Sequence, residues 1–137
     1  MIKTKTILLE DVPIPDRKGN WEFLDIPIHI IKIDRETLAV LELPYSQIPF
    51  ENHRGKLTNF KCALLGHEFP HGSATRNPKD IDNPETSERL AVRRACCDCS
   101  LDYDELGFVG RIIWRHYREW LKRKKAAIIA DLLKDKL

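Results

Sequence analysis

The chain has 137 residues, of which 42% are apolar and 32% are charged. This length fits one domain with at most an appendage, and this composition excludes a disordered chain. The net charge is only +2, but residues 111–137 carry nine basic and three acidic residues. Such a local excess of positive charge favours an acidic partner for the C-terminal segment.

The beginning of the sequence lacks the features of a secretory signal. Residues 1–10 contain a short basic stretch and only three consecutive apolar residues. A signal needs roughly 7 to 15 apolar residues, and a membrane span needs roughly 20. We therefore expect an intracellular protein without a membrane partner.

The first third of the sequence predicts a small antiparallel sheet. Residues 21–26 and 28–33 alternate apolar with polar side chains and contain β-branched residues, and residues 6–9 and 37–43 are further strand candidates. Residues 34–36 form a short polar connection. Pro13 and Pro15 are expected to end the first strand, and Pro27 is expected to interrupt the second, because proline donates no backbone hydrogen bond.

Two later segments are predicted to be irregular. Residues 44–60 contain several turn formers, and residues 70–88 are rich in Pro, Gly, Ser, Asn and Asp. A loop as long as the second is usually functional or is held at its ends. The cysteine and histidine residues that flank it offer such an anchor.

Four of these flanking residues form a pattern typical of a structural zinc site. Zinc prefers four sulfur or nitrogen ligands in a tetrahedral arrangement. Cys96 and Cys99 form a Cys-x-x-Cys turn, and Cys62 and His67 supply a second pair with Gly66 between them. Four protein ligands leave no position for a reacting water, so we expect one structural zinc ion rather than a catalytic one.

Two neighbouring residues leave the ligand set open. His71 is the main rival to His67, and Cys97 is a rival to Cys96, although its spacing from Cys99 favours a buried filler. A disulfide is disfavoured because nothing indicates secretion, and a redox site is disfavoured because no βαβ pattern surrounds the cysteines. No catalytic motif is evident, so we expect no enzyme and no small-molecule substrate.

The sequence KCALLGHEF at residues 61–69, with RACCDC at 94–99, resembles the short zinc-ribbon-like proteins of bacteriophages and prophages. Those proteins combine a cysteine, a Gly-His pair followed by an aromatic residue, and a Cys-x-x-Cys. The resemblance covers about residues 61–100. It departs from the family in the long segment 68–95 and in Ser100, where glycine is commoner. The resemblance implies zinc and a viral source, and hence a location in the host cytoplasm or the virus particle.

From about residue 104 the pattern becomes helical. One face gathers apolar and aromatic residues: Ile113, Trp114, Tyr117, Trp120, Leu121 and Ile128. The opposite face carries five basic residues at steps of four and three, here called the basic stripe: Arg111, Arg115, Arg118, Lys122 and Lys125. The basic stripe would be about 21 Å long. His116, in the same helix, is expected to be structural.

These observations predict an α+β fold with a small antiparallel sheet, a zinc-knuckle or zinc-ribbon-like core and a C-terminal amphipathic basic helix. Residues 1–110 would form the β-rich zinc-binding domain, and residues 111–137 would form the helix packed on it. The expected function is binding of nucleic acid, or of an acidic protein surface of the transcription or replication machinery, through the basic stripe. The alternative is a structural or assembly component of a virus particle or another multi-subunit complex.

Overall fold

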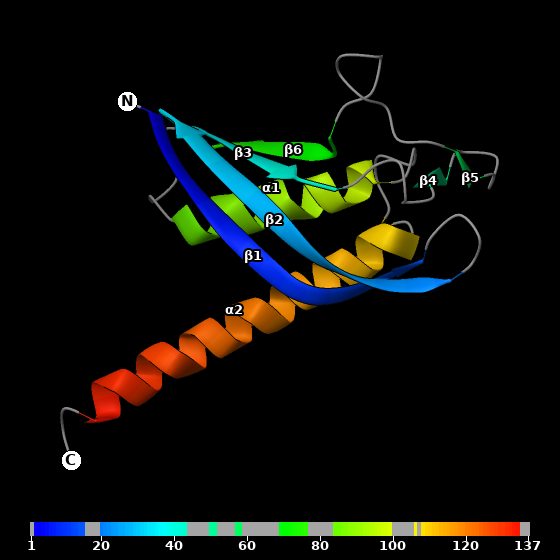
Figure 1. Cartoon of the computed structure of the whole chain (residues 1–137). Coiled ribbons are helices and arrows are strands. Elements are labelled where there is room, and N and C mark those ends of the chain that lie inside the picture. Colours follow the sequence, from blue (N-terminus) through cyan, green and yellow to red (C-terminus); the bar gives the residue numbers. More distant parts are fainter. Residues whose placement is uncertain are drawn as a thin grey trace.

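The computed structural model of the chain is an α+β fold in which a four-stranded antiparallel sheet packs against two helices (Figure 1). It describes residues 2–15, 20–43, 50–51, 57–58, 69–76, 84–99, 106 and 108–134. The sheet has the strand order β1 (Ile2–Pro15), β2 (Trp21–Ile33), β3 (Glu36–Leu41) and β6 (His71–Thr75). The helices are α1 (Pro84–Asp98) and α2 (Phe108–Lys134), and a separate short pair consists of β4 (Phe50–Glu51) and β5 (Leu57–Thr58).

The core lies on one face of the sheet because the side chains of a strand alternate between its two faces. The buried positions follow this period: Ile7, Leu9, Val12 and Ile14 in β1, Ile26, Ile28 and Ile30 in β2, Ala39 and Leu41 in β3, and Ala74 in β6. Burying one such aliphatic side chain contributes about 1.5 to 3 kcal/mol. The helices cover this face, with α1 against β3 and β6 and α2 against β1.

A β-bulge bends the first strand and keeps its apolar residues inward. Three residue steps on β1, from Leu9 to Val12, lie opposite only two steps on β2. Asp11 has a φ of 52°, and its N–H donates a hydrogen bond to Oδ1 of Asp25 at 3.0 Å. The extra residue shifts the alternation of side chains by one position, so Leu9 and Val12, which are three residues apart, both face the core and are buried.

The prediction that Pro13 and Pro15 forbid continued pairing is wrong, although β1 does end at Pro15. β1 continues through both residues, which lie opposite Phe23 and Trp21 of β2. β1 is an edge strand of this sheet. An edge strand pairs on one side only, and a proline whose nitrogen faces the other side removes no hydrogen bond from the ladder.

The predicted interruption at Pro27 is also absent, since β2 runs through this residue. The Pro27 carbonyl accepts a hydrogen bond from the Glu42 N–H at 3.0 Å. This bond lies just beyond the pair of Ile28 with Leu41, where β3 ends. The missing N–H of Pro27 therefore falls at the end of the β2–β3 ladder, where it costs little.

The segment predicted to be a loop, residues 70–88, contains strand β6 and the beginning of α1. Helix α1 was not predicted, although its buried residues Ala91, Val92 and Ala95 recur at helical spacing. β6 lies close against it: a Cβ on Gly72 would overlap backbone atoms of Ala91 and Ala95. The predicted irregular segment 44–60 lies mostly outside the described residues.

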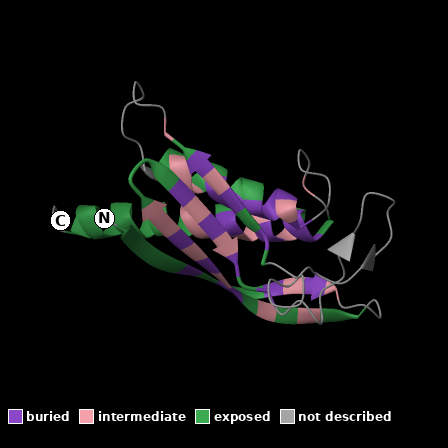
Figure 2. Cartoon of the chain, turned by 90° about the horizontal axis from the view of Figure 1, so that it is seen from above, coloured by how far each residue is buried: buried purple, intermediate pink, exposed green. Residues whose placement is uncertain are grey.

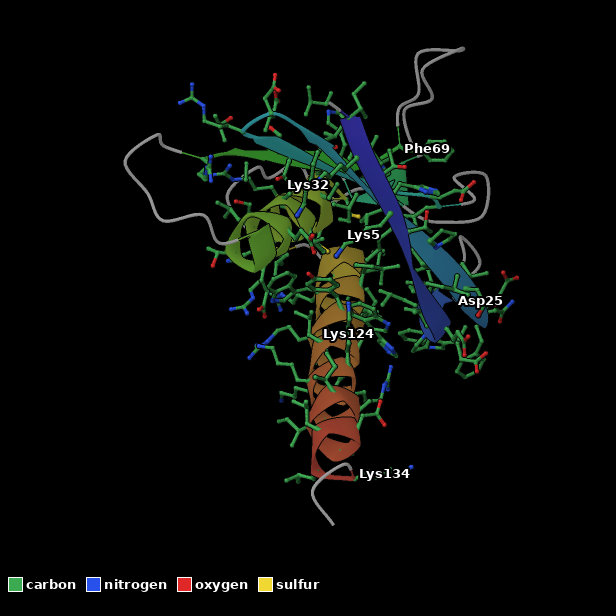
Figure 3. The ribbon with its side chains drawn as sticks, turned by 90° about the vertical axis from the view of Figure 1, so that its left-hand side faces the viewer. Lys5, Asp25, Lys32, Phe69, Lys124 and Lys134 are labelled. Atoms are coloured by element: carbon green, nitrogen blue, oxygen red, sulfur yellow. The ribbon has the colours of Figure 1, made fainter. Side chains whose placement is uncertain are left out.

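An ion-pair cluster fixes α1 to the strands. Glu88 of α1 contacts Nζ of Lys5 on β1 at 2.7 Å and Nζ of Lys32 on β2 at 2.8 Å, and its side chain is only 12% exposed. Burial alone would raise the pKa of Glu88, but the hydrogen bonds and charges of the two lysines outweigh it and hold the pKa below its ordinary value. Figure 3 places both lysines on the helical side of the sheet.

Helix α2 confirms the predicted C-terminal helix, but only its first half packs on the body. Its buried residues are Val109, Gly110, Ile113 and Tyr117, and every described residue after Leu121 is exposed (Figure 2). Ile128 was predicted to share the packed face and is 51% exposed instead, so that prediction is wrong. Of the helices that the structure describes, none has the length and apolarity to span a bilayer.

Candidate functional site

The five residues of the basic stripe lie on the exposed side of α2. The opposite side of the same turns carries Ile113 and Tyr117, which are buried against the sheet and α1. Because these residues orient the helix, the cations of the basic stripe face solvent. Between Arg111 and Lys125 the sequence has only one acidic residue, Glu119. The stripe therefore presents a nearly continuous positive surface.

The two ends of the basic stripe have different surroundings. At one end, Nε of Arg111 donates a hydrogen bond to the Leu106 carbonyl at 3.2 Å. At the other end, Nζ of Lys125 lies 2.9 Å from Oε1 of Glu85 on α1, and both side chains remain about half exposed. The hydrogen bond and charge of Lys125, with Arg89, hold the pKa of Glu85 below its ordinary value. An exposed pair of this kind contributes little to stability and leaves the lysine accessible to an anion.

A groove of about 460 Å³, here called the aromatic groove, lies beside the first turns of α2. Its lining comes from α2 and from the end of the β1–β2 ribbon: Pro13, Trp21, Phe108, Arg111, Ile112, Arg115 and His116. The ring centroids of Trp21 and Phe108 are 6.0 Å apart, and the rings are tilted by 59°. Arg111 and Arg115 belong to both the groove and the basic stripe, so the two features form one surface.

Sequence reasoning missed the aromatic groove. Trp21 was assigned only to a strand, Phe108 received no role and His116 was expected to be structural. The three come together because the ribbon bends at its bulge and brings Trp21 to Phe108 at the beginning of α2. This contact spans 87 positions in the sequence, so no local spacing signals it.

The other two tryptophans of the chain, Trp114 and Trp120, lie on α2 and belong to its packing surface. Tyr117 stacks between Trp114, at 5.6 Å, and Trp120, at 6.2 Å. The Arg93 guanidinium of α1 lies 5.9 Å from the Trp114 ring centroid. Burial raises the pKa of Tyr117 to about 12. These contacts fix the side of α2 that faces α1, and leave Trp21 as the tryptophan of the groove.

The cysteine turn lies at the end of α1. Cys96, Cys97 and Cys99 are buried and form no disulfide. The Cys99 N–H donates to the Cys96 carbonyl at 3.3 Å, and the Cys99 thiol donates to the Ala95 carbonyl at 3.7 Å. Burial raises the pKa of the Cys96 and Cys99 thiols, since it disfavours the thiolate. A bound cation would offset that cost and favour the deprotonated sulfurs.

The other half of the predicted zinc site, Cys62 and His67, lies outside the described residues. Within the part of the chain that the structure describes, no three His, Cys, Asp or Glu residues gather at a metal-binding distance. The rival ligand His71 lies near the cysteine turn, because its N–H donates to Oδ2 of Asp98 at 3.1 Å. Its Nδ1 is 3.1 Å from the Phe69 carbonyl. His71 is therefore near the end of α1 without completing a ligand cluster.

No family model, curated protein or solved structure matches this chain. The case for a function therefore rests on its own residues, and above all on the surface formed by the basic stripe and the aromatic groove.

Proposed function

We propose that the protein is a non-catalytic nucleic-acid-binding module that contacts phosphates through the basic stripe. The observation that carries this proposal is the exposure of five cations along about 21 Å of one helix face. Lys and Arg side chains that neutralise phosphates supply most of the affinity of such modules and little of their sequence preference. Tight packing of the first half of α2 supports the proposal, because it holds Arg111, Arg115 and Arg118 outward before any ligand binds.

Charge reversal within the basic stripe tests the proposal. The double variant Arg118→Glu/Lys122→Glu changes two exposed residues outside the aromatic groove, so folding should be preserved. Its affinity for a 16-nucleotide DNA, measured by fluorescence anisotropy, should fall at least tenfold. The matched control is Lys3→Glu/Arg35→Glu, which makes the same charge change at an exposed residue of β1 and an exposed residue of the β2–β3 turn, and should bind like the wild type.

The salt dependence supplies a second measurement. Five phosphate contacts predict that log K falls with log salt concentration at a slope of about −3 to −5. Wild-type protein that binds neither single-stranded nor duplex DNA at low salt would contradict the proposal. Equal losses of DNA affinity in the stripe variant and the control variant would show that binding depends on net charge and not on the basic stripe.

We further propose that one structural zinc ion, held by Cys62, His67, Cys96 and Cys99, stabilises the body. The observation in its favour is the buried pair of thiols at the end of α1. Zinc binding would contribute to folding directly, because thiolate ligands are assembled only in the folded chain. Freshly purified protein should hold about one zinc per chain by elemental analysis.

Four substitutions test the ligand assignment. Cys99→Ser and His67→Ala should each abolish zinc binding and cooperative unfolding. Cys97→Ala should retain zinc and cost at most about 1 to 2 kcal/mol of packing, and His71→Ala should retain zinc. Absence of zinc from wild-type protein produced with zinc supplied would refute the site. Loss of zinc only in Cys97→Ala and His71→Ala would instead show that these two residues are ligands.

An assembly component is the second candidate function, and the end of α2 favours it. Four large apolar side chains there are more than half exposed: Ile128, Ile129, Leu132 and Leu133. Lys122, Lys125 and Lys134 lie near them, so a second copy of this chain would bring like charges together. The partner that fits is another chain with an amphipathic helix flanked by acidic residues.

A Leu/Glu amphipathic peptide is a direct probe of that partner class. It should gain helicity on mixing with wild-type protein, measured by circular dichroism, and Ile129→Asp/Leu133→Asp should abolish the gain. Binding of the peptide to both proteins alike would remove this candidate, and self-association in sedimentation runs would replace the partner by a second copy.

A further inference from the structure

The aromatic groove exposes large apolar rings in a way that packing does not explain. Trp21 is 55% exposed, Phe108 is 54% exposed, and Phe23, two residues along the same strand from Trp21, is 70% exposed. Exposed apolar residues that cluster at one place usually mark a binding surface, whereas scattered ones need no explanation. Trp21 and Phe108 touch each other and line the same groove, so they form such a cluster.

The rings of Trp21 and Phe108 belong to a strand and a helix rather than to a loop. Trp21 is the first residue of β2 and lies opposite Pro15, while Phe108 is the first residue of α2. The contact between Trp21 and Phe108 therefore joins the β1–β2 ribbon to α2, at a place where α2 packs against β1. Because both elements are fixed by the core, the rings form a preorganised platform that loses little entropy when a flat ligand stacks on it.

The charge around the platform selects an anionic ligand. Arg111 and Arg115 line the groove, and the hydrogen bond to Leu106 fixes Arg111 through one of its five N–H donors. No acidic residue occurs among the described residues that line the groove, and the first turn of α2 has none either. The volume of about 460 Å³ lies within the range of roughly 300 to 1,000 Å³ for ligand pockets.

We propose that the aromatic groove binds single-stranded nucleic acid, with an unpaired base stacked on Trp21 and Phe108 and the adjoining phosphates held by Arg111 and Arg115. This inference rests on the proposed function and deepens it, because the basic stripe alone would accept duplex and single strand alike. A duplex keeps its bases stacked on each other, so only a single strand offers a free base face to the rings. The stripe would then carry the strand onward along α2.

The test compares two nucleic acids and two exposed aromatic sites. The probes are a 16-nucleotide oligothymidylate and a 16-base-pair duplex, each titrated at the same salt concentration. Trp21→Ala and Phe108→Ala should each weaken oligothymidylate binding roughly tenfold or more while leaving the duplex nearly unaffected. Trp21→Phe should restore most of the affinity, since stacking needs only a ring. Oligothymidylate should also quench the tryptophan fluorescence of the wild type.

The control is Phe69→Ala, which removes a half-exposed aromatic residue far from α2 (Figure 3) and should change neither affinity. Circular dichroism establishes that each variant is folded, and a variant that unfolds is replaced by Trp21→Leu or Phe108→Leu, which keeps an apolar side chain and removes only the ring. Wild-type protein that binds both probes with equal affinity, insensitive to Trp21→Ala, would overturn the inference and leave the proposed function standing. Protein that binds neither probe, or only polyglutamate, would overturn both.

Discussion

The two halves of helix α2 carry apolar residues at the same helical spacing, but one half is packed on the body and the other is exposed to solvent. The inner half, residues 108–121, buries Ile113 and Tyr117 among the sheet and α1. The outer half, residues 122–134, carries aliphatic residues at similar spacing, yet Ile129 and Leu132 are 57% and 62% exposed. Figure 1 shows the outer half extending away from the sheet and α1. An apolar helix face therefore predicts burial only where the rest of the chain extends to cover it.

The difference also separates the roles of the two halves. The inner half is held by core contacts, so it fixes the orientation of the first residues of the basic stripe and of the aromatic groove. The outer half contributes no buried residue, and isolated helices of this length are marginal in water. We expect it to fray in the free protein and to gain helicity when a partner covers it.

A matched pair of aliphatic truncations should give the largest contrast. Ile113→Ala removes a side chain that is fully buried, and should cost about 2 to 5 kcal/mol of unfolding free energy because it leaves a cavity in the core. Ile129→Ala makes the same chemical change in the outer half, and should change the stability by less than about 0.5 kcal/mol. Denaturant unfolding followed by tryptophan fluorescence measures both, and similar costs would mean that the outer half is covered in solution.

A smaller effect should come from the cluster that holds α1, and with it the inner half of α2. Glu88→Gln should cost about 1 to 2 kcal/mol at neutral pH, because the paired carboxylate becomes neutral. The folded-state pKa of Glu88 lies below its ordinary value of 4.5, so its contribution is complete above that value and is lost as the pH falls through the folded pKa. The wild type should therefore lose more stability than Glu88→Gln on acidification. Parallel acid-unfolding curves would contradict this role of Glu88.

The smallest effect is expected where the two halves of α2 meet. Lys125 pairs with Glu85 on α1 across an exposed contact, which salt and side-chain entropy weaken. Lys125→Ala should leave the denaturation midpoint unchanged while it lowers nucleic-acid affinity. A clear loss of stability would show that this pair holds α2 in place beyond the inner half.

The sequence predicts β2, β3 and the inner half of α2 well, because their regular apolar spacing matches their burial. Ile26, Ile28 and Ile30 alternate strictly, and all three are buried. The prolines misled the prediction, since their effect depends on strand position: Pro13 lies in an edge strand, and Pro27 lies where the β2–β3 ladder ends. Neither fact is visible before the strand order is known.

Helix α1 and the groove were missed for different reasons. Small residues such as Ala91 and Ala95 form the buried side of α1. Because alanine is only weakly hydrophobic and polar residues surround these positions, the sequence shows no clear helical pattern of apolar residues. The groove depends on a contact between Trp21 and Phe108, which only the bend of the β1–β2 ribbon creates. Of the predicted zinc ligands, Cys96 and Cys99 lie in one turn and Cys62 and His67 lie outside the described residues, so the zinc site stays a prediction.

The two prolines of β1 have a further consequence for the behaviour of the protein in concentrated solution. An edge strand with free N–H groups is a template on which another chain can extend the sheet, and such growth leads to aggregation. Pro13 and Pro15 offer no donor along the end of β1, and the bulge at Asp11 twists the strand just before them. Intermolecular strand pairing is thus blocked next to Trp21, and the rings can stay exposed without seeding a fibril.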